Sequence, residues 1–402
     1  MKPIYIIASV LIPFLAYSQC NRSEVVSNYN TTYLASSVSV DELAWNGNVE
    51  TCQSGSVSLS SLQKTLDRIN YFRGLVGLPQ NITFNNELNA KCQEAALMMH
   101  ANTSLSHYPP ENWSCWTADG YDAASHSNLA MGTHSSSSIT AYMRDNGSGN
   151  YAVGHRRWIL YSKASEFGSG STSNYNALYV ISTTVPAPDD LSFIAYPSPG
   201  FFPKPLVFDR WSFSVPGADF SAAVVQMQTQ SGLPITLSIE ELANGYGDNT
   251  IVWVPELSLA SSGDETISVN ISNVGNATQS EYEYQVIVMN DLNDSELAHP
   301  PTCPENTSWS EALCACVGES TESWSCTNNN CDMSSDGKGE FLSLQECQAE
   351  CGTSSSIDLF DKTDKTLLKI VNILGQETPF RYNTPLFYIY DDGSVEKKMI
   401  SK

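Results

Sequence analysis

Three short segments carry the fold of this chain: LSHYP at residues 105–109, SNLAMG at 127–132 and VGHRRW at 153–158. A segment LDRINYFR at 66–73 precedes them and has the three- and four-residue apolar spacing of a helix face. The first and third segments each place a histidine beside an apolar stretch. Because folded apolar segments bring distant residues together, we expect His107 and His155 to converge on one cleft.

The surrounding sequence predicts helices followed by a small sheet. Apolar residues recur at helical spacing from Leu59 onward, Ser60 or Ser61 can cap this helix, and Gly77 with Pro79 ends it. The later elements are a second helix after Asn85 or Asn86, a third at 139–144, and strands at 166–169 and 177–183.

In their order, these segments resemble the CAP superfamily of cysteine-rich secretory, antigen 5 and pathogenesis-related 1 proteins, over residues 59–184. The resemblance implies a three-layer α-β-α sandwich and an extracellular protein. It also implies a cleft with two histidines and two acidic residues, in which some members of the family bind zinc or another divalent cation.

The cleft residues can be carried over by position. His107 and His155 match the two histidines, and Asp145 matches the second acidic residue. Two imidazoles and one carboxylate would supply three ligands to Zn²⁺ or another divalent cation, with water in the fourth position. The alternative is that both histidines form hydrogen bonds within a polar cleft and bind no metal.

The first acidic residue of the cleft is missing. Ser127 stands where the resemblance implies a glutamate, and a serine hydroxyl supplies no charge. The neighbouring His126, or Asp122 one helical turn earlier, can compensate for the lost charge. The candidate site is therefore His107, Ser127, Asp145 and His155.

Other chemistry-bearing residues have simpler expectations. Arg156 and Arg157 are expected to meet either an anionic ligand or the carboxylates of the chain. The aromatic residues Trp158, Trp211 and Phe213 are expected to pack in cores. His100 is expected to be a packed or capping residue, and His134 a solvated loop residue.

Residues 197–292 predict an antiparallel β-sandwich, because short apolar or alternating runs are separated by turn residues. The proline-rich stretch 186–205 is expected to be a linker or a rigid surface segment. The predicted strands are 210–215, 222–229, 234–239, 250–254, 266–271 and 282–289. Their predicted core is Phe213, Val215, Val225, Met227, Leu237, Ile239, Val252, Val254, Ile267, Val269, Val286 and Val288.

The N-terminal region indicates export. A charged start and a short apolar run lead to Ala16-Tyr17-Ser18, the pattern of a secretory signal at residues 1–18. No apolar run is long enough to span a bilayer. Residues 19–58 are rich in Ser, Asn and Thr and predict a loosely ordered lead-in, which a disulfide between Cys20 and Cys52 could close.

The C-terminal third predicts two further parts. Seven of the eleven cysteines lie between Cys303 and Cys351, which predicts a disulfide-stapled module at 303–352. Residues 357–402 resemble the β-rich sorting segment of the type IX secretion system of Bacteroidota. That resemblance implies a protein that is secreted or attached to the outer-membrane surface through a processed C-terminus. The whole chain is thus predicted to be α+β.

Composition narrows the classes of function. The chain has 20 basic and 43 acidic residues, a formal charge of −23, so binding to nucleic acid is not expected. Neither a Gly-x-Ser-x-Gly elbow nor a His-Glu-x-x-His motif is present. We place binding of an extracellular lipid, glycan or peptide first. The first alternative is an extracellular metal-assisted hydrolase that acts on peptides or cell-wall material. The second is a structural adhesin with a vestigial cleft. We favour binding over catalysis.

Overall fold

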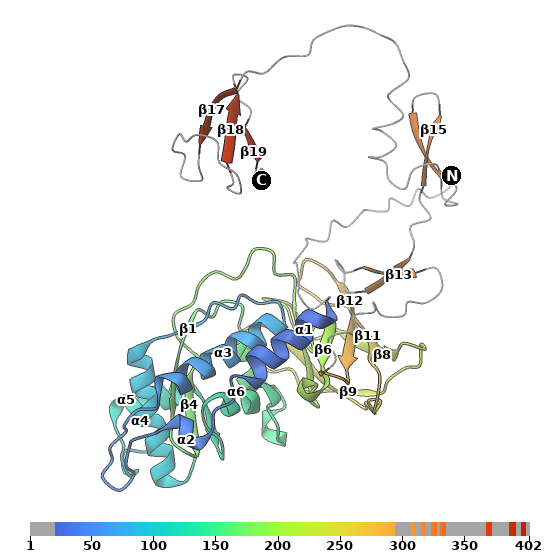
Figure 1. The fold of residues 1–402 in the computed structure, drawn as a ribbon. Helices are drawn as coiled ribbons and strands as arrows, with labels where there is room; N and C mark the ends of the chain where they lie inside the picture. Colours follow the sequence, from blue (N-terminus) through green and yellow to red (C-terminus); the bar gives the residue numbers. More distant parts are fainter. Residues whose placement is uncertain are drawn as a thin grey trace. The chain divides into compact units, whose positions relative to one another are not determined.

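The structure is a computed structural model that describes residues 21–293 and the strand segments 307–310, 315–318, 323–327, 330–334, 367–371, 386–390 and 395–398 (Figure 1). The chain divides into a unit ending at Glu319 and a second unit beginning at Ser320. The signal at 1–18 and Cys20 lie outside the described residues. Among those described, no helix has the length and apolar character needed to cross a membrane.

The first part of the larger unit is helical. Its elements are α1 (Arg22–Asn28), the π-helix η2 (Tyr29–Leu34), α2 (Val40–Leu43), α3 (Leu59–Leu75), α4 (Asn86–Asn102), α5 (Ala118–His126), α6 (Ser135–Arg144), the 3-10 helix η3 (Ser148–Asn150) and α7 (Gly154–Ile159). The three helices predicted from apolar spacing are α3, α4 and α6, and they are confirmed. Ser58 rather than Ser60 or Ser61 caps α3, and Asn85 caps α4 as expected.

A four-stranded sheet runs through this helical part. The strands β1 (Thr83–Phe84), β2 (Ser127–Met131), β3 (Glu166–Ser171) and β4 (Tyr175–Tyr179) lie in the order β1-β3-β4-β2. Alternate residues of a strand point to opposite faces of its sheet. Accordingly, Tyr175, Ala177 and Tyr179 pack with α4 and α5, whereas Leu178 packs in a larger core with α3 and α6.

Two further sheets follow, at residues 194–289, called the two-sheet region here. One has the order β5-β7-β10-β9, from β5 (Ile194–Tyr196), β7 (Trp211–Ser214), β9 (Leu237–Ile239) and β10 (Thr250–Pro255). The other has the order β6-β12-β11-β8, from β6 (Gly200–Pro203), β8 (Val224–Thr229), β11 (Glu265–Ser272) and β12 (Glu281–Met289). Rings from both sheets meet, as in Phe213 against Tyr284 with centroids 6.2 Å apart. A short 3-10 helix η4 (Lys204–Leu206) follows β6.

Three expectations for this region need correction. The proline-rich stretch 186–205 is not only a linker, because it contains the buried strands β5 and β6. Strand β6 pairs parallel to β12, so that sheet is mixed rather than antiparallel. Within the predicted core, Ile239 is 46% exposed because β9 lies at the edge of its sheet, whereas Trp211 and Phe213 are fully buried as expected.

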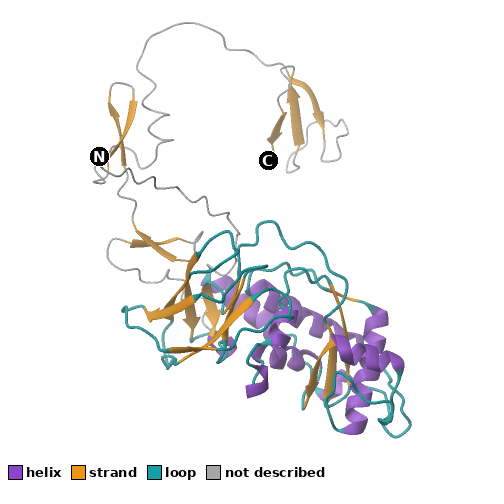
Figure 2. Ribbon diagram, turned by 180° about the vertical axis from the view of Figure 1, so that it is seen from behind, coloured by secondary structure: helices purple, strands orange, loops and turns teal. Residues whose placement is uncertain are grey.

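The helical part and the two-sheet region share one hydrophobic core. A single cluster of buried side chains contains Phe72, Ile159 and Phe167 from the first part, and Phe202 and Trp211 from the second. Figure 2 shows the helices gathered at one end of this unit and the two-sheet region at the other. The two parts are thus stabilised together by burial of apolar surface.

The segment predicted as a loose lead-in is instead ordered. Asn21 caps α1, and the Arg22 guanidinium forms an ion pair with Asp264 at 2.7 Å. Val25 and Val26 of α1 pack against Phe201, Ile287 and Met289 of the two-sheet region. The polar composition misled the prediction, because a few apolar side chains placed on one helix turn are enough to dock it.

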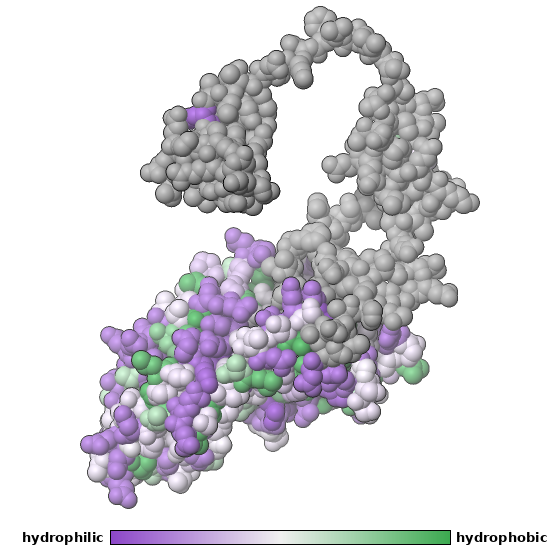
Figure 3. All heavy atoms as spheres, in the orientation of Figure 1, coloured by the Kyte–Doolittle hydropathy of each residue, from purple (hydrophilic) through white to green (hydrophobic). Residues whose placement is uncertain are grey.

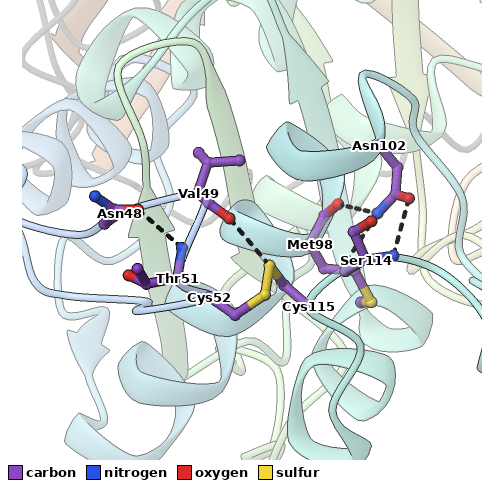
Figure 4. Close-up of a disulfide and its surroundings, with 8 residues drawn as sticks. All are labelled: Asn48, Val49, Thr51, Cys52, Met98, Asn102, Ser114 and Cys115. Carbon is purple, nitrogen blue, oxygen red and sulfur yellow. Dashed lines mark hydrogen bonds between the residues drawn. A yellow bond between two sulfur atoms is a disulfide. The ribbon is translucent and has the colours of Figure 1, made fainter.

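Cys52 pairs with Cys115 rather than with Cys20, which corrects the predicted disulfide (Figure 4). The segment around Cys52 folds on itself through the Trp45 indole, which donates to the carbonyl of Ser54 at 2.8 Å. On the other side, Asn102 of α4 holds both the N–H and the carbonyl of Ser114, at 3.1 and 3.0 Å. These contacts place the two sulfur atoms side by side.

The C-terminal strands form small sheets of their own. In the first unit β13 (Thr307–Ser310) pairs with β14 (Ala315–Gly318). In the second, β15 (Ser323–Thr327) pairs with β16 (Asn330–Ser334), and β17 (Leu367–Val371), β18 (Leu386–Tyr390) and β19 (Val395–Lys398) form a three-stranded sheet. Cys331 is disulfide-bonded. The predicted module at 303–352 and the sorting segment at 357–402 otherwise lie outside the described residues.

Candidate functional site

One cavity of about 320 Å³ is lined by three of the four predicted cleft residues. It is bounded by the loop after α4, the start of β2, the first turns of α7, the residues after β4 and the loop between β9 and β10. Its lining comprises His107, Tyr108, Ser125, Ser127, Asn128, Gly149, Asn150, Ala152, Gly154, His155, Trp158, Val180, Ile181, Gly245 and Tyr246. Of the four candidate site residues, His107, Ser127 and His155 line the cavity and Asp145 does not.

Asp145 lies behind His155 and holds its ring. The Asp145 carboxylate is buried and accepts from His155 Nδ1 at 2.7 Å and from the His155 backbone N–H at 2.9 Å. Because a carboxylate accepts hydrogen bonds, the Nδ1 of His155 carries the hydrogen in this contact, and in the neutral ring Nε2 is then the acceptor nitrogen. The ring also stacks on Tyr142 of α6, with centroids 5.5 Å apart. His155 is therefore fixed in both orientation and tautomer.

The backbone explains why Asp145 reaches this position. Helix α6 ends at Arg144, and Asp145 is its C-cap in the left-handed conformation with φ 52°. Aspartate tolerates this conformation better than most residues. Its side chain then meets the first turn of α7, whose own N-cap residue Val153 provides no side-chain hydrogen bond. Asp145 thus both caps α7 and orients His155.

His107 is held in a similar way by the main chain. Its Nδ1 lies 2.9 Å from the carbonyl oxygen of Ala124 at the end of α5. A carbonyl is only an acceptor, so the Nδ1 of His107 also carries the hydrogen, and in the neutral ring its Nε2 is the acceptor. Both cavity histidines therefore have one nitrogen engaged behind the ring and the other available to a ligand.

The missing first acid is not replaced in the cavity. His126 and Asp122 contact each other, Nδ1 to Oδ1 at 3.4 Å, outside the lining. Asp122 also pairs with Lys91 at 2.7 Å. The Ser127 hydroxyl lies 3.9 Å from the sulfur of Cys92, a buried thiol whose pKa burial raises to about 12. Among the residues that the structure describes, none that could act as a base forms a hydrogen bond with the Ser127 hydroxyl, as activation of a serine nucleophile would require.

The three-ligand metal site expected from sequence is not assembled. Among the described residues, no group of three or more His, Cys, Asp and Glu side chains is placed to hold a metal ion. Asp145 contacts the Nδ1 side of His155, opposite to the nitrogen that would face a metal. His107 and His155 are the two histidines that line the cavity.

Arg156 and Arg157 were expected to meet either an anionic ligand or the carboxylates of the chain, and the structure gives both of them other partners. Both guanidinium groups are buried, and both donate to main-chain carbonyls of the two-sheet region rather than to a ligand or to surface carboxylates. Burial lowers the pKa of each to about 10, so both stay protonated at neutral pH. The sequence signal for this is the pair of adjacent cations directly before the apolar residues Trp158, Ile159 and Leu160.

The other histidines that the structure describes lie outside the cavity. His100 stacks on Tyr175 with centroids 5.1 Å apart, the packed position expected for it. His134 is partly buried at the start of α6, where burial lowers its pKa, so it is not a solvated loop residue. Trp158 is only partly buried and lines the cavity. Tyr246, from the two-sheet region, is a lining residue that the sequence reasoning missed.

Replacing Asp145 by asparagine should change the tautomer of His155. An asparagine that accepts the His155 backbone N–H turns its NH₂ group toward Nδ1, which then has to become the acceptor. We expect the hydrogen to move to Nε2 and the unfolding free energy to fall by about 1–3 kcal/mol, the range for removing a buried charged partner. The ¹⁵N shifts of the imidazole report the tautomer. Asp119→Asn, at a 63% exposed carboxylate on α5, is the matched control. An unchanged Nδ1–H in Asp145→Asn would contradict this assignment.

Comparison with known proteins agrees with the segments that opened the sequence. Residues 66–185 match the family model described as the cysteine-rich secretory protein family, CAP. No curated protein and no solved structure matches the chain. The matched range covers every lining residue of the cavity except Gly245 and Tyr246.

Proposed function

We propose that this protein is an exported CAP-domain protein that binds a neutral glycan segment in the cavity lined by His107 and His155. The CAP domain, with the three-layer arrangement of its family, provides most of the cavity wall. Export is supported by the signal-like start and by the Cys52–Cys115 disulfide, since disulfides persist in oxidising compartments. Attachment to the cell surface through the C-terminal sorting segment is part of the same proposal.

The chemistry of the lining is the observation that carries the proposal. None of its residues is Lys, Arg, Asp or Glu, so the lining offers a charged ligand no ion-pair partner of these four types. Hydroxyl, amide and imidazole groups come from Ser127, Asn128, Asn150 and the two histidines. Aromatic rings come from Tyr108, Trp158 and Tyr246. Uncharged hydrogen-bonding groups beside aromatic faces are what a sugar ring requires, because it has both hydroxyl edges and apolar C–H faces.

Size and surface favour a glycan over a lipid. A volume of about 320 Å³ lies at the low end of the roughly 300–1,000 Å³ typical of small-ligand pockets. The aliphatic part of the lining is limited to Ala152, Val180 and Ile181. On the face of the molecule in Figure 3, the green hydrophobic residues of the described part are scattered among hydrophilic ones. A lipid tail would need a larger continuous apolar surface.

Binding of chitotetraose and cellotetraose to the full chain, measured by calorimetry, tests the proposal. We expect His155→Ala to weaken binding about tenfold, the size of one lost hydrogen bond. His126→Ala is the control, because His126 lies outside the cavity and packs on Tyr179. Failure of the wild-type chain to bind a panel of neutral oligosaccharides, or equal affinity of His155→Ala, would contradict the proposal. Phosphatidylcholine vesicles with cholesterol serve as the lipid comparison.

A divalent cation is the second candidate ligand. His107 and His155 both donate Nδ1–H to an oxygen atom, the arrangement by which metal-binding histidines are usually oriented. A cation would be bound by these two imidazoles alone, with solvent in the other positions. Zinc titration of the wild-type chain and of His107→Ala checks this; no heat of binding in the wild type excludes it.

Hydrolysis is the third candidate. The His155–Asp145 pair has the geometry of a general base with its orienting carboxylate, and such a group contributes about 10²–10⁴-fold to a rate. No Asp or Glu is among the described residues that line the cavity. For this reason binding is placed before catalysis, and a purely adhesive role remains the alternative if no ligand binds.

A further inference from the structure

The loop between β9 and β10 supplies one wall of the CAP cavity. Gly245 and Tyr246 line the same cavity as His155, although they lie in the two-sheet region about ninety residues further along the chain. A Cβ atom at Gly154, the residue before His155, would come within 2.7 Å of the Tyr246 ring. The ring thus lies directly against the start of α7, and the absence of a side chain at Gly154 allows this contact.

This loop is held from within the protein. Arg157 Nη1 donates to the carbonyl of Ala243 at 2.9 Å, and its Nη2 donates to the carbonyl of Asp248 at 3.0 Å. The Asp248 carboxylate in turn accepts from the backbone N–H and the hydroxyl of Ser162, at 2.8 and 2.9 Å. Both ends of the segment around Tyr246 are therefore tied to the CAP domain by buried hydrogen bonds.

The turn itself requires glycine on both sides of the tyrosine. Gly245 and Gly247 have φ of 91° and 58°, a conformation that side chains rarely adopt. A Cβ at Gly247 would also approach the carbonyl oxygen of Arg157 to 3.1 Å. The backbone is thus bent tightly at Tyr246, and its ring is held in place before any ligand arrives. Binding then loses little conformational entropy at this side chain.

Part of the Tyr246 side chain remains accessible to a ligand. It is 38% exposed, and its hydroxyl makes no hydrogen bond to any residue that the structure describes. The Arg157 guanidinium lies 5.4 Å from the ring centroid. An aromatic ring that is anchored on one side and open to a polar, uncharged cavity on the other can stack on the C–H face of a sugar.

We propose that Tyr246 determines the specificity of the cavity by stacking on a neutral sugar ring, so that the binding site is shared between the CAP domain and the two-sheet region. This inference depends on the proposed glycan binding. It adds that the CAP domain does not form the complete site, because one aromatic wall comes from outside it.

The test is the affinity of the full chain for chitotetraose and cellotetraose, measured by calorimetry. Tyr246→Ala is expected to bind about tenfold more weakly than wild type, and Tyr246→Phe within about threefold of it, because the ring and not the hydroxyl makes the contact. Tyr121→Ala is the matched control, since Tyr121 is also 38% exposed but lies on α5 outside the cavity. Thermal unfolding of each variant shows whether the fold is retained.

The outcomes separate the two proposals. If His155→Ala weakens binding while Tyr246→Ala binds like wild type, the role of Tyr246 is overturned and the proposed function stands. If Tyr246→Phe loses as much affinity as Tyr246→Ala, stacking is overturned. If the wild-type chain binds no neutral oligosaccharide, both proposals are overturned together.

Discussion

Replacing Arg156 by alanine is expected to lower the free energy of unfolding by about 3–5 kcal/mol. The side chain is completely buried between the helical part and the two-sheet region. Its Nε donates to the carbonyl of Met143 at 2.7 Å, and its Nη1 donates to the carbonyl of Arg210 at 2.8 Å. The guanidinium also lies 4.4 Å from the ring centroid of Tyr196. Alanine would leave both carbonyls without a donor and open a cavity between the two parts.

Urea unfolding followed by fluorescence measures this loss. Arg144→Ala is the matched control, because Arg144 is exposed at the end of α6 and its guanidinium lies 5.2 Å from the ring centroid of Phe208. We expect the control to change the free energy by less than about 1 kcal/mol. A similarly small change in Arg156→Ala would show that Arg156 does not join the two parts.

Removing the Cys52–Cys115 disulfide, by Cys52→Ser together with Cys115→Ser, is expected to cost about 4 kcal/mol. The bond closes a loop with a sequence separation of 63 residues. In the chain-entropy account, a loop of that length restricts the unfolded chain by about this amount. The double variant avoids a reductant, which would also attack the disulfide that contains Cys331.

The same unfolding measurement compares the double variant with wild type. Thr51→Ala is the control in the same loop, since Thr51 is exposed and its backbone N–H, which the substitution keeps, makes the contact with Asn48. A control change within about 0.5 kcal/mol is expected. A double variant that stays within 1 kcal/mol of wild type would mean that the disulfide adds little to the folded state.

Local patterns predicted several elements of the described chain, and most of its other elements were not predicted. The helices α3, α4 and α6 and the strands β7 to β12 follow from apolar spacing and turn residues, which depend on neighbours only a few positions apart. The capping residue of α3 was placed a few positions late, because several serines in the run can cap. Ser58 was selected by a tertiary contact, since its hydroxyl also donates to the carbonyl of Glu42 at 2.6 Å.

The site was predictable only in part. The order of the sequence segments identified His107, Ser127 and His155 as site residues, and all three line one cavity. It placed Asp145 among the metal ligands, whereas the left-handed turn at the end of α6 directs that carboxylate to the back of the His155 ring. Which side of an imidazole meets a carboxylate depends on backbone geometry ten residues away, and residue spacing does not contain it.

The sequence by itself determined the periodic elements, the CAP resemblance of residues 59–184 and the identity of the two cavity histidines. Tertiary structure alone decided that Arg156 and Arg157 bind carbonyls 54 to 91 residues away, that Cys52 pairs with Cys115, and that Tyr246 forms a wall of the cavity. The physical reason is the distance along the sequence between the residues that make each kind of contact. Helix and strand patterns arise from contacts between near neighbours, whereas the partner of a buried charge, a thiol or an aromatic ring is set by how two separate parts pack on one core.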